Sequence, residues 1–155
     1  MQFANYFFAS LISYLGLLVG IALIKIAPEE QKPLARYFVL MRRILPMLIF
    51  LFVMLYYYNI WFYTLALSIY LAFFLFVELK PINSMNKSMI IYGFLGIIFY
   101  LSSKNQNLFM VESSLIFIFG MPASSLTYNK SEKNHFSIFL YNLTFLIMAN
   151  LLYFL

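Results

Sequence analysis

Six apolar stretches, each long enough to cross a lipid bilayer, are the feature that most constrains the fold of this chain. A bilayer core about 30 Å thick is crossed by a helix of roughly 17 to 25 apolar residues. The polar breaks in the sequence predict spans near 5–26, 39–58, 60–78, 88–103, 109–128 and 136–155. We therefore expect an all-α fold, a polytopic integral membrane bundle of about six transmembrane helices.

The composition agrees with a membrane class and excludes several kinds of chemistry. Hydrophobic residues make up 65% of the chain and charged residues 10%, whereas soluble globular proteins have about half and about a quarter. The 155 residues contain no long polar insert, so we expect one transmembrane domain over 1–155. Cysteine is absent, which excludes disulfides and thiolate metal sites.

The boundary between the second and third spans carries no charge and depends on aromatic residues instead. The stretch "YYYNIWFY" at 56–63 is rich in tyrosine and contains Trp61, and such rings favour the membrane interface. We interpret it as a hairpin bend at Asn59. The alternative, one apolar helix over 44–78, would greatly exceed the thickness of the bilayer.

The connections between the six spans alternate between the two sides of the membrane, and the basic residues in them predict an orientation. If the main loop at 27–38 faces the cytoplasm, the loops at 79–87 and 129–135 do so as well, and both termini face outward. Nine basic residues then lie inside and only Lys104 lies outside, which is a strong positive-inside pattern. The membrane is a plasma or an organellar one. The nine inside residues are Lys25, Lys32, Arg36, Arg42, Arg43, Lys80, Lys87, Lys130 and Lys133.

The stretch "KIAPEEQKPLARYFVLMRR" at 25–43 concentrates the charge of the chain. We expect a helix start at Pro28, an interruption or restart at Pro33, and then a helix along the cytoplasmic interface. Its charges serve either as a topology anchor or as contacts for a protein partner or lipid head groups. Catalysis by the adjacent glutamates is the third interpretation. The candidate contact residues are Glu29, Glu30, Lys32, Arg36, Arg42 and Arg43.

All five glycines lie inside predicted spans, which predicts close helix packing. In the first span, Gly16 and Gly20 share one helical face with Ala9 and Ser13. Gly93 and Gly96 predict a second packing face in the fourth span, and a third follows Ser113, Gly120 and Ser124 in the fifth. The same small residues also allow docking of a partner or a second copy of the chain.

The stretch "FGMPASS" at 119–125 predicts a break in the fifth span. Pro122 lacks the N–H that would bond to residue 118, so we expect a kink there, with Gly120, Ser124 and Ser125 beside it. Broken helices bind substrates in some transporters, although a kink is also ordinary packing geometry. Glu112, near the outer end of this span, lies either within the membrane as a functional acid or at the head groups.

The sequence contains no nucleotide-binding loop, HExxH or GxSxG pattern, and we expect no catalytic residue, metal site, cofactor or nucleic-acid partner. The leading hypothesis is a non-catalytic membrane subunit or scaffold that contacts other subunits or further copies of itself. The alternative is a small oligomeric transporter or channel that uses the broken fifth helix. The third hypothesis is an intramembrane enzyme that uses Glu29, Glu30 or Glu112, so enzymatic activity stays open although the sequence favours its absence.

Overall fold

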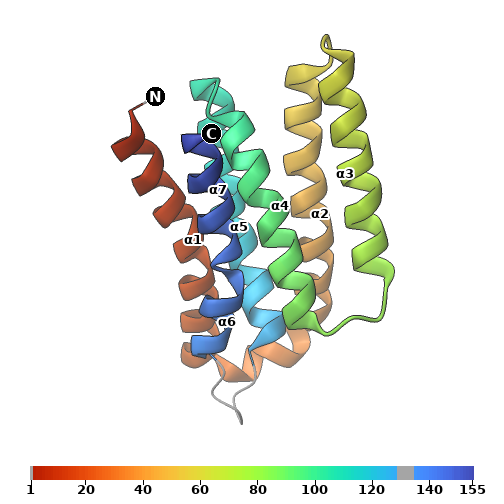
Figure 1. Cartoon of the computed structure of the whole chain (residues 1–155). Helices are drawn as coiled ribbons and strands as arrows, with labels where there is room; N and C mark the ends of the chain where they lie inside the picture. Colours follow the sequence, from red (N-terminus) through yellow and green to blue (C-terminus); the bar gives the residue numbers. More distant parts are fainter. Residues whose placement is uncertain (1, 129–134) are drawn as a thin grey trace.

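The computed structural model describes residues 2–128 and 135–155, and within these ranges the chain is helical and contains no strand (Figure 1). Six segments of the described chain are long and apolar enough to cross a membrane, with α6 and α7 together forming the sixth. The predicted all-α bundle is confirmed. The elements are α1 (Phe3–Ile26), the short 3-10 helix η1 (Pro28–Glu30), α2 (Gln31–Tyr57), α3 (Trp61–Leu79), α4 (Ser84–Ser102), α5 (Gln106–Thr127), α6 (His135–Asn142) and α7 (Thr144–Phe154).

The hairpin predicted between the second and third spans is present. Helix α2 ends at Tyr57 and α3 begins at Trp61, and the Ile60 N–H donates to the Tyr57 carbonyl across the turn at 2.9 Å. Trp61 and Tyr58 are exposed at this turn, as expected of rings at a membrane interface. The single long helix over 44–78 is therefore excluded.

The helix predicted within the connecting segment 27–38 is present, and it begins at Pro28 as expected. After η1, helix α2 begins at Gln31 and continues without interruption into the second span. Pro33 does not restart the helix, because it is the third residue of α2 and a proline in the first turn removes no intrahelical hydrogen bond. Figure 1 shows these first turns in orange, crossing one end of the bundle.

A local irregularity of the helix lies in the sixth span, and the fifth span is continuous. Helix α5 runs through Pro122 from Gln106 to Thr127, whereas α6 and α7 are separated at Leu143. Polar side chains flank this point: Asn142 donates to the Ile138 carbonyl, and Thr144 donates to the Met89 carbonyl of α4. Side-chain bonds of this kind compete with the regular helical pattern. The predicted loop at 129–135 lies outside the described residues except for His135, where α6 begins.

Helix α5 occupies the centre of the bundle and packs against α1, α2 and α4. Helices α6 and α7 pack on α4, and α3 lies at the edge against α2 (Figure 1). Both termini lie at one end, with the α2–α3 and α4–α5 turns; we call it the terminal end. The opposite end holds the C-terminus of α1, η1, the start of α2 and the α3–α4 connection; we call it the basic end.

Aromatic side chains fill the space between the central helices. Tyr6 of α1 is fully buried, packs against Phe99 and Phe109, and donates its hydroxyl to the Ala149 carbonyl of α7 at 2.8 Å. Deeper in the bundle, Tyr92 packs against Phe119 and Phe145. These contacts join α1, α4, α5 and α7 into one core.

Candidate functional site

Exposed charges cover the helical segment that crosses the basic end. Glu29 and Glu30 of η1, and Lys32 and Arg36 of α2, are all exposed. The side-chain amide of Gln31 fixes this segment to the bundle by donating to the Ser125 and Tyr128 carbonyls at the end of α5, at 3.2 and 3.4 Å. These two carbonyls belong to the unpaired C-terminal groups of a helix, which need external donors. We call this segment, 29–36, the charged platform.

Arg42, which the sequence grouped with these residues as a contact for a partner or lipid head groups, is buried and does not belong to the charged platform. Its side chain is 9% exposed and pairs with Glu78 of α3, which is 4% exposed. The Arg42 Nη2 atom lies 3.2 and 3.3 Å from the two Glu78 carboxylate oxygens, and Nη1 donates to the Ser84 hydroxyl at 2.9 Å. A buried charge is unfavourable unless it is paired. The α2–α3 hairpin places Arg42 and Glu78 side by side, so each charge offsets the burial of the other.

Two further cations contact Glu78. The Arg43 Nε atom lies 3.4 Å from the same carboxylate, and half of the Arg43 side chain is exposed. Lys87 of α4 donates to the Glu78 backbone carbonyl at 2.6 Å, near the C-terminus of α3, where the helix dipole favours a cation. We call Arg42, Arg43, Glu78, Ser84 and Lys87 the arginine cluster.

Glu78 was not among the residues singled out from the sequence. The available signal was an acid at the end of a span, on the same predicted side of the membrane as Arg42 and Arg43. An acid at that depth requires a partner. Its pairing depends on the relative rotation of α2 and α3, which the sequence does not specify.

The small residues of α1 and α5 form a close seam between these two helices. A Cβ atom at Gly16 would overlap the Phe117 carbonyl, and one at Gly20 would lie 2.6 Å from the Met121 carbonyl oxygen. On the facing helix, a Cβ at Gly120 would lie 2.7 Å from the Gly16 Cα atom. The two backbones therefore touch, and the face carrying Gly16 and Gly20 is occupied within the chain by α5.

The two glycines of the fourth span differ from each other. A Cβ at Gly96 would lie 2.7 Å from the Phe145 carbonyl oxygen of α7, so α4 and α7 approach closely there. Gly93 has no atom within 4 Å of such a Cβ. Only Gly96 of the predicted pair therefore lies at a close helix contact.

The residues of the predicted break are used within α5 and its packing. Gly120, Pro122, Ser124 and Ser125 are buried. The Ser124 hydroxyl donates to the Gly120 carbonyl of its own helix at 2.9 Å, which is the usual solution for a serine within a membrane helix. In this conformation the hydroxyl is directed to the backbone rather than to a substrate.

Glu112 is fully buried in the central helix, and neither carboxylate oxygen has a hydrogen-bond partner among the described residues. The prediction left its depth open; the structure places it inside the bundle. It precedes Thr127, at the basic end, by 15 residues of helix, about 22 Å along the axis. Glu29 and Glu30 lie at the basic end, so the three glutamates of the enzyme hypothesis do not meet at one point.

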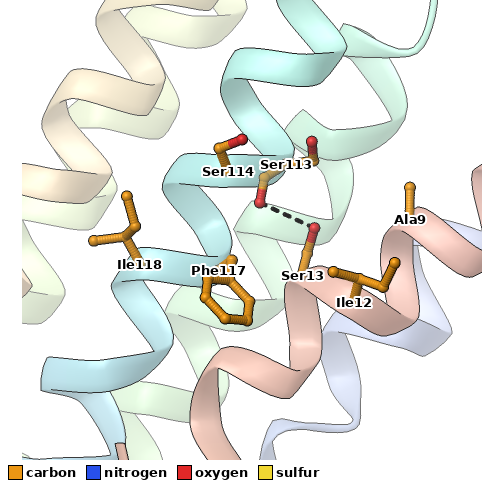
Figure 2. A pocket seen from close by; sticks show the side chains of 7 residues that line it. All are labelled: Ala9, Ile12, Ser13, Ser113, Ser114, Phe117 and Ile118. Carbon is orange, nitrogen blue, oxygen red and sulfur yellow. Dashed lines mark hydrogen bonds between the residues drawn. The ribbon is translucent and has the colours of Figure 1, made fainter. Parts of the chain in front are cut away.

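An open pocket of about 380 Å³ lies between α1 and α5 on the terminal side of their seam. Figure 2 shows its lining: Ile12 and Phe117 project from the two helices, and the Ser13 hydroxyl donates to the Ser113 carbonyl at 3.0 Å. A second pocket, of about 560 Å³, shares Ala9 and Ser113 with the first and extends to Lys104. The two helices therefore diverge from Gly16 toward the terminal end.

Comparison of the chain with models of protein families, with curated proteins and with solved structures gives no match. A functional assignment therefore depends on the chemistry of the described residues.

Proposed function

We propose that this chain is a non-catalytic integral membrane subunit or scaffold whose charged platform contacts another protein at the membrane surface. The observation that carries the proposal is the contrast between buried and exposed charge at the basic end. Arg42 and Glu78 are buried against each other, whereas Glu29, Glu30, Lys32 and Arg36 are exposed.

The attachment of the charged platform supports a docking role. Gln31 lies in the middle of the platform and is bonded to two carbonyls of the central helix. Exposed charges on a segment with a fixed position lose less conformational entropy on binding than charges on a free loop. Both signs of charge are present, which favours a protein partner of mixed charge and gives specificity.

The proposed orientation places the basic end in the cytoplasm. Of the basic residues in the described chain, Lys104 alone lies at the terminal end. Positive residues remain on the cytoplasmic side when short loops are inserted. Both termini then face outward.

The test is native mass spectrometry of the protein extracted gently from its own membrane, combined with cross-linking at the charged platform. We expect a stoichiometric protein partner that cross-links to positions 29–36. The double substitution Lys32→Glu and Arg36→Glu reverses two exposed charges and should remove the partner, while the bundle remains folded.

Lys104→Glu is the matched control, because it reverses a charge at the opposite end of the bundle. Partner loss in both variants would indicate a general effect of net charge and contradict the platform assignment. A lone monomer or a pure homo-oligomer in the wild-type extract would reject the subunit proposal.

Glu112 favours a second candidate function, a small oligomeric transporter or channel. A buried carboxyl group without a hydrogen-bond partner is unfavourable within a membrane, and such residues often mark ion or proton pathways. In this candidate Glu112 binds the transported cation or proton. This form of the hypothesis does not need a broken α5.

Flux of monovalent cations and protons into vesicles containing the purified protein tests this candidate. Glu112→Gln keeps the size of the side chain and removes its charge, so flux should fall at least tenfold while the unfolding temperature stays equal or rises. Gly93→Ala, at an uncrowded position of α4, should leave flux unchanged. Equal flux in wild type and Glu112→Gln would reject the site.

A further inference from the structure

The arginine cluster carries more positive charge than its own carboxylate balances. Arg42, Arg43 and Lys87 all contact Glu78, and no second carboxylate pairs with them in residues 2–128 or 135–155. Three cations against one carboxylate leave an excess of two positive charges. An excess of this kind in a partly buried site attracts an anion.

One donor at the centre of the cluster has no acceptor. The Arg42 Nε atom is buried and unpartnered, although the other guanidinium nitrogens bond to Glu78 and Ser84. An unsatisfied buried donor is unfavourable, so an additional acceptor would stabilise the site. The Arg43 side chain, half exposed, keeps the cluster accessible from outside the bundle.

The surrounding backbone also favours an anion. Ser84, which accepts from Arg42, is the first residue of α4. The N-terminus of a 19-residue helix presents free N–H groups and the positive end of its dipole. The Asn83 side chain accepts from the Met85 N–H, which leaves other first-turn N–H groups available.

We propose that the arginine cluster binds a phosphate group, with Arg42, Arg43 and Lys87 as its donors and Glu78 as the carboxylate that positions Arg42. Arginine is suited to phosphate because its guanidinium donates several hydrogen bonds in a fixed fork. The cluster lies where the α3–α4 connection meets the ends of two candidate membrane spans, and phospholipid head groups surround the ends of such spans. An anionic phospholipid of the same leaflet is therefore the nearest source of phosphate, and a free phosphate compound has the same chemistry.

The site does not depend on the charged platform or on a protein partner. It uses residues of α2, α3 and α4 that the chain itself brings together. Loss of the partner in the experiment above would therefore leave phosphate binding intact, and the two proposals fail separately.

The experiment titrates the detergent-purified full chain with phosphatidylglycerol and follows the unfolding temperature. Phosphatidylcholine, which has no net charge, and inorganic phosphate at matched ionic strength form the comparison arms. We expect saturable stabilisation by phosphatidylglycerol and little by phosphatidylcholine. Stabilisation by inorganic phosphate to the same extent would identify a free phosphate compound as the ligand, and its absence would identify the lipid.

Three variants test the residue assignment. Arg43→Gln and Lys87→Gln each remove one excess charge and keep the Arg42–Glu78 pair, so each should raise the half-saturating lipid concentration about fivefold. Lys25→Gln makes the same charge change at an exposed position of the basic end and should leave it unchanged. Equal stabilisation by both lipids, or the same half-saturation in all three variants, would overturn the proposal.

Discussion

Helices α1 and α3 are attached to the bundle by different kinds of contact. Helix α1 touches α5 backbone to backbone, through Gly16, Gly20 and Gly120. Helix α3 lies at the edge of the bundle, and an ion pair between Glu78 and Arg42 joins it to α2. The α1–α5 seam consists of short-range contacts spread along the helices, whereas the strongest polar contact of α3 is concentrated at one end.

The difference shows two solutions to helix association in lipid. Lipid tails are as apolar as leucine side chains, so hydrophobic burial does not drive helices together. Close backbone approach gains many weak dispersion contacts, and a buried ion pair gains one strong contact that becomes a large penalty when one partner is lost. We expect single substitutions to affect the two regions unequally.

Glu78→Gln should have the largest effect. It leaves Arg42 buried without a counter-charge, and loss of one partner of a buried pair costs about 3 to 5 kcal/mol. Unfolding in detergent with increasing denaturant measures the loss. The exposed Glu30→Gln serves as a control, with an expected change within about 0.5 kcal/mol.

The double variant Arg42→Leu with Glu78→Leu sharpens this test. Replacing both charges by apolar groups is often neutral, so the double variant should be more stable than Glu78→Gln. If the double variant were as unstable as Glu78→Gln, the ion pair itself would stabilise the fold. The loss in Glu78→Gln would then not come only from the unpaired Arg42.

Gly16→Ala should have the next largest effect. The added methyl group overlaps the Phe117 carbonyl, which is backbone and moves only with its helix, and overpacking typically costs about 1 to 3 kcal/mol. The same denaturant series measures it. Gly93→Ala is the matched control, since its Cβ meets open space, and a loss there as large as at Gly16 would contradict the seam.

Ser13→Ala should have the smallest effect. It removes the hydrogen bond to the Ser113 carbonyl across the seam, and interhelical hydrogen bonds in membranes contribute about 0.6 kcal/mol on average. Ser68→Ala, whose hydroxyl bonds within its own helix, controls for loss of a hydroxyl. If Ser13→Ala destabilised as much as Gly16→Ala, hydrogen bonding rather than backbone contact would dominate the seam.

Sequence reasoning located the spans well because their length and apolarity are local properties. The hairpin at Asn59 was found from interfacial rings, and the observed helix ends lie within a few residues of the predicted ones except at the start of α2. The interfacial helix after Pro28 was predicted, but its continuity with the second span was not, because Pro33 and the charges around it indicated an interruption. The irregularity at Leu143 was not predicted because no proline or glycine marks it.

The candidate sites were only partly accessible to the same reasoning. Gly16 and Gly20 lie on one face of any helix, so the sequence alone predicted that the face packs, but it did not name α5 as the partner. Arg42 was grouped with Arg43 as a contact residue because both belong to the charge concentrated at 25–43. The two residues differ by about 100° around the helix, and only the packing of α3 decides which of them is buried.

The sequence by itself determined the membrane class, the six spans and the excess of basic residues at one end, because each depends on local composition and on the thickness of a bilayer. The tertiary structure alone decided that α5 is central, that Glu78 pairs with Arg42, and that Glu112 is buried without a partner. These features depend on how helices rotate and pack against each other, and contacts between residues far apart in the chain leave no local signal in it.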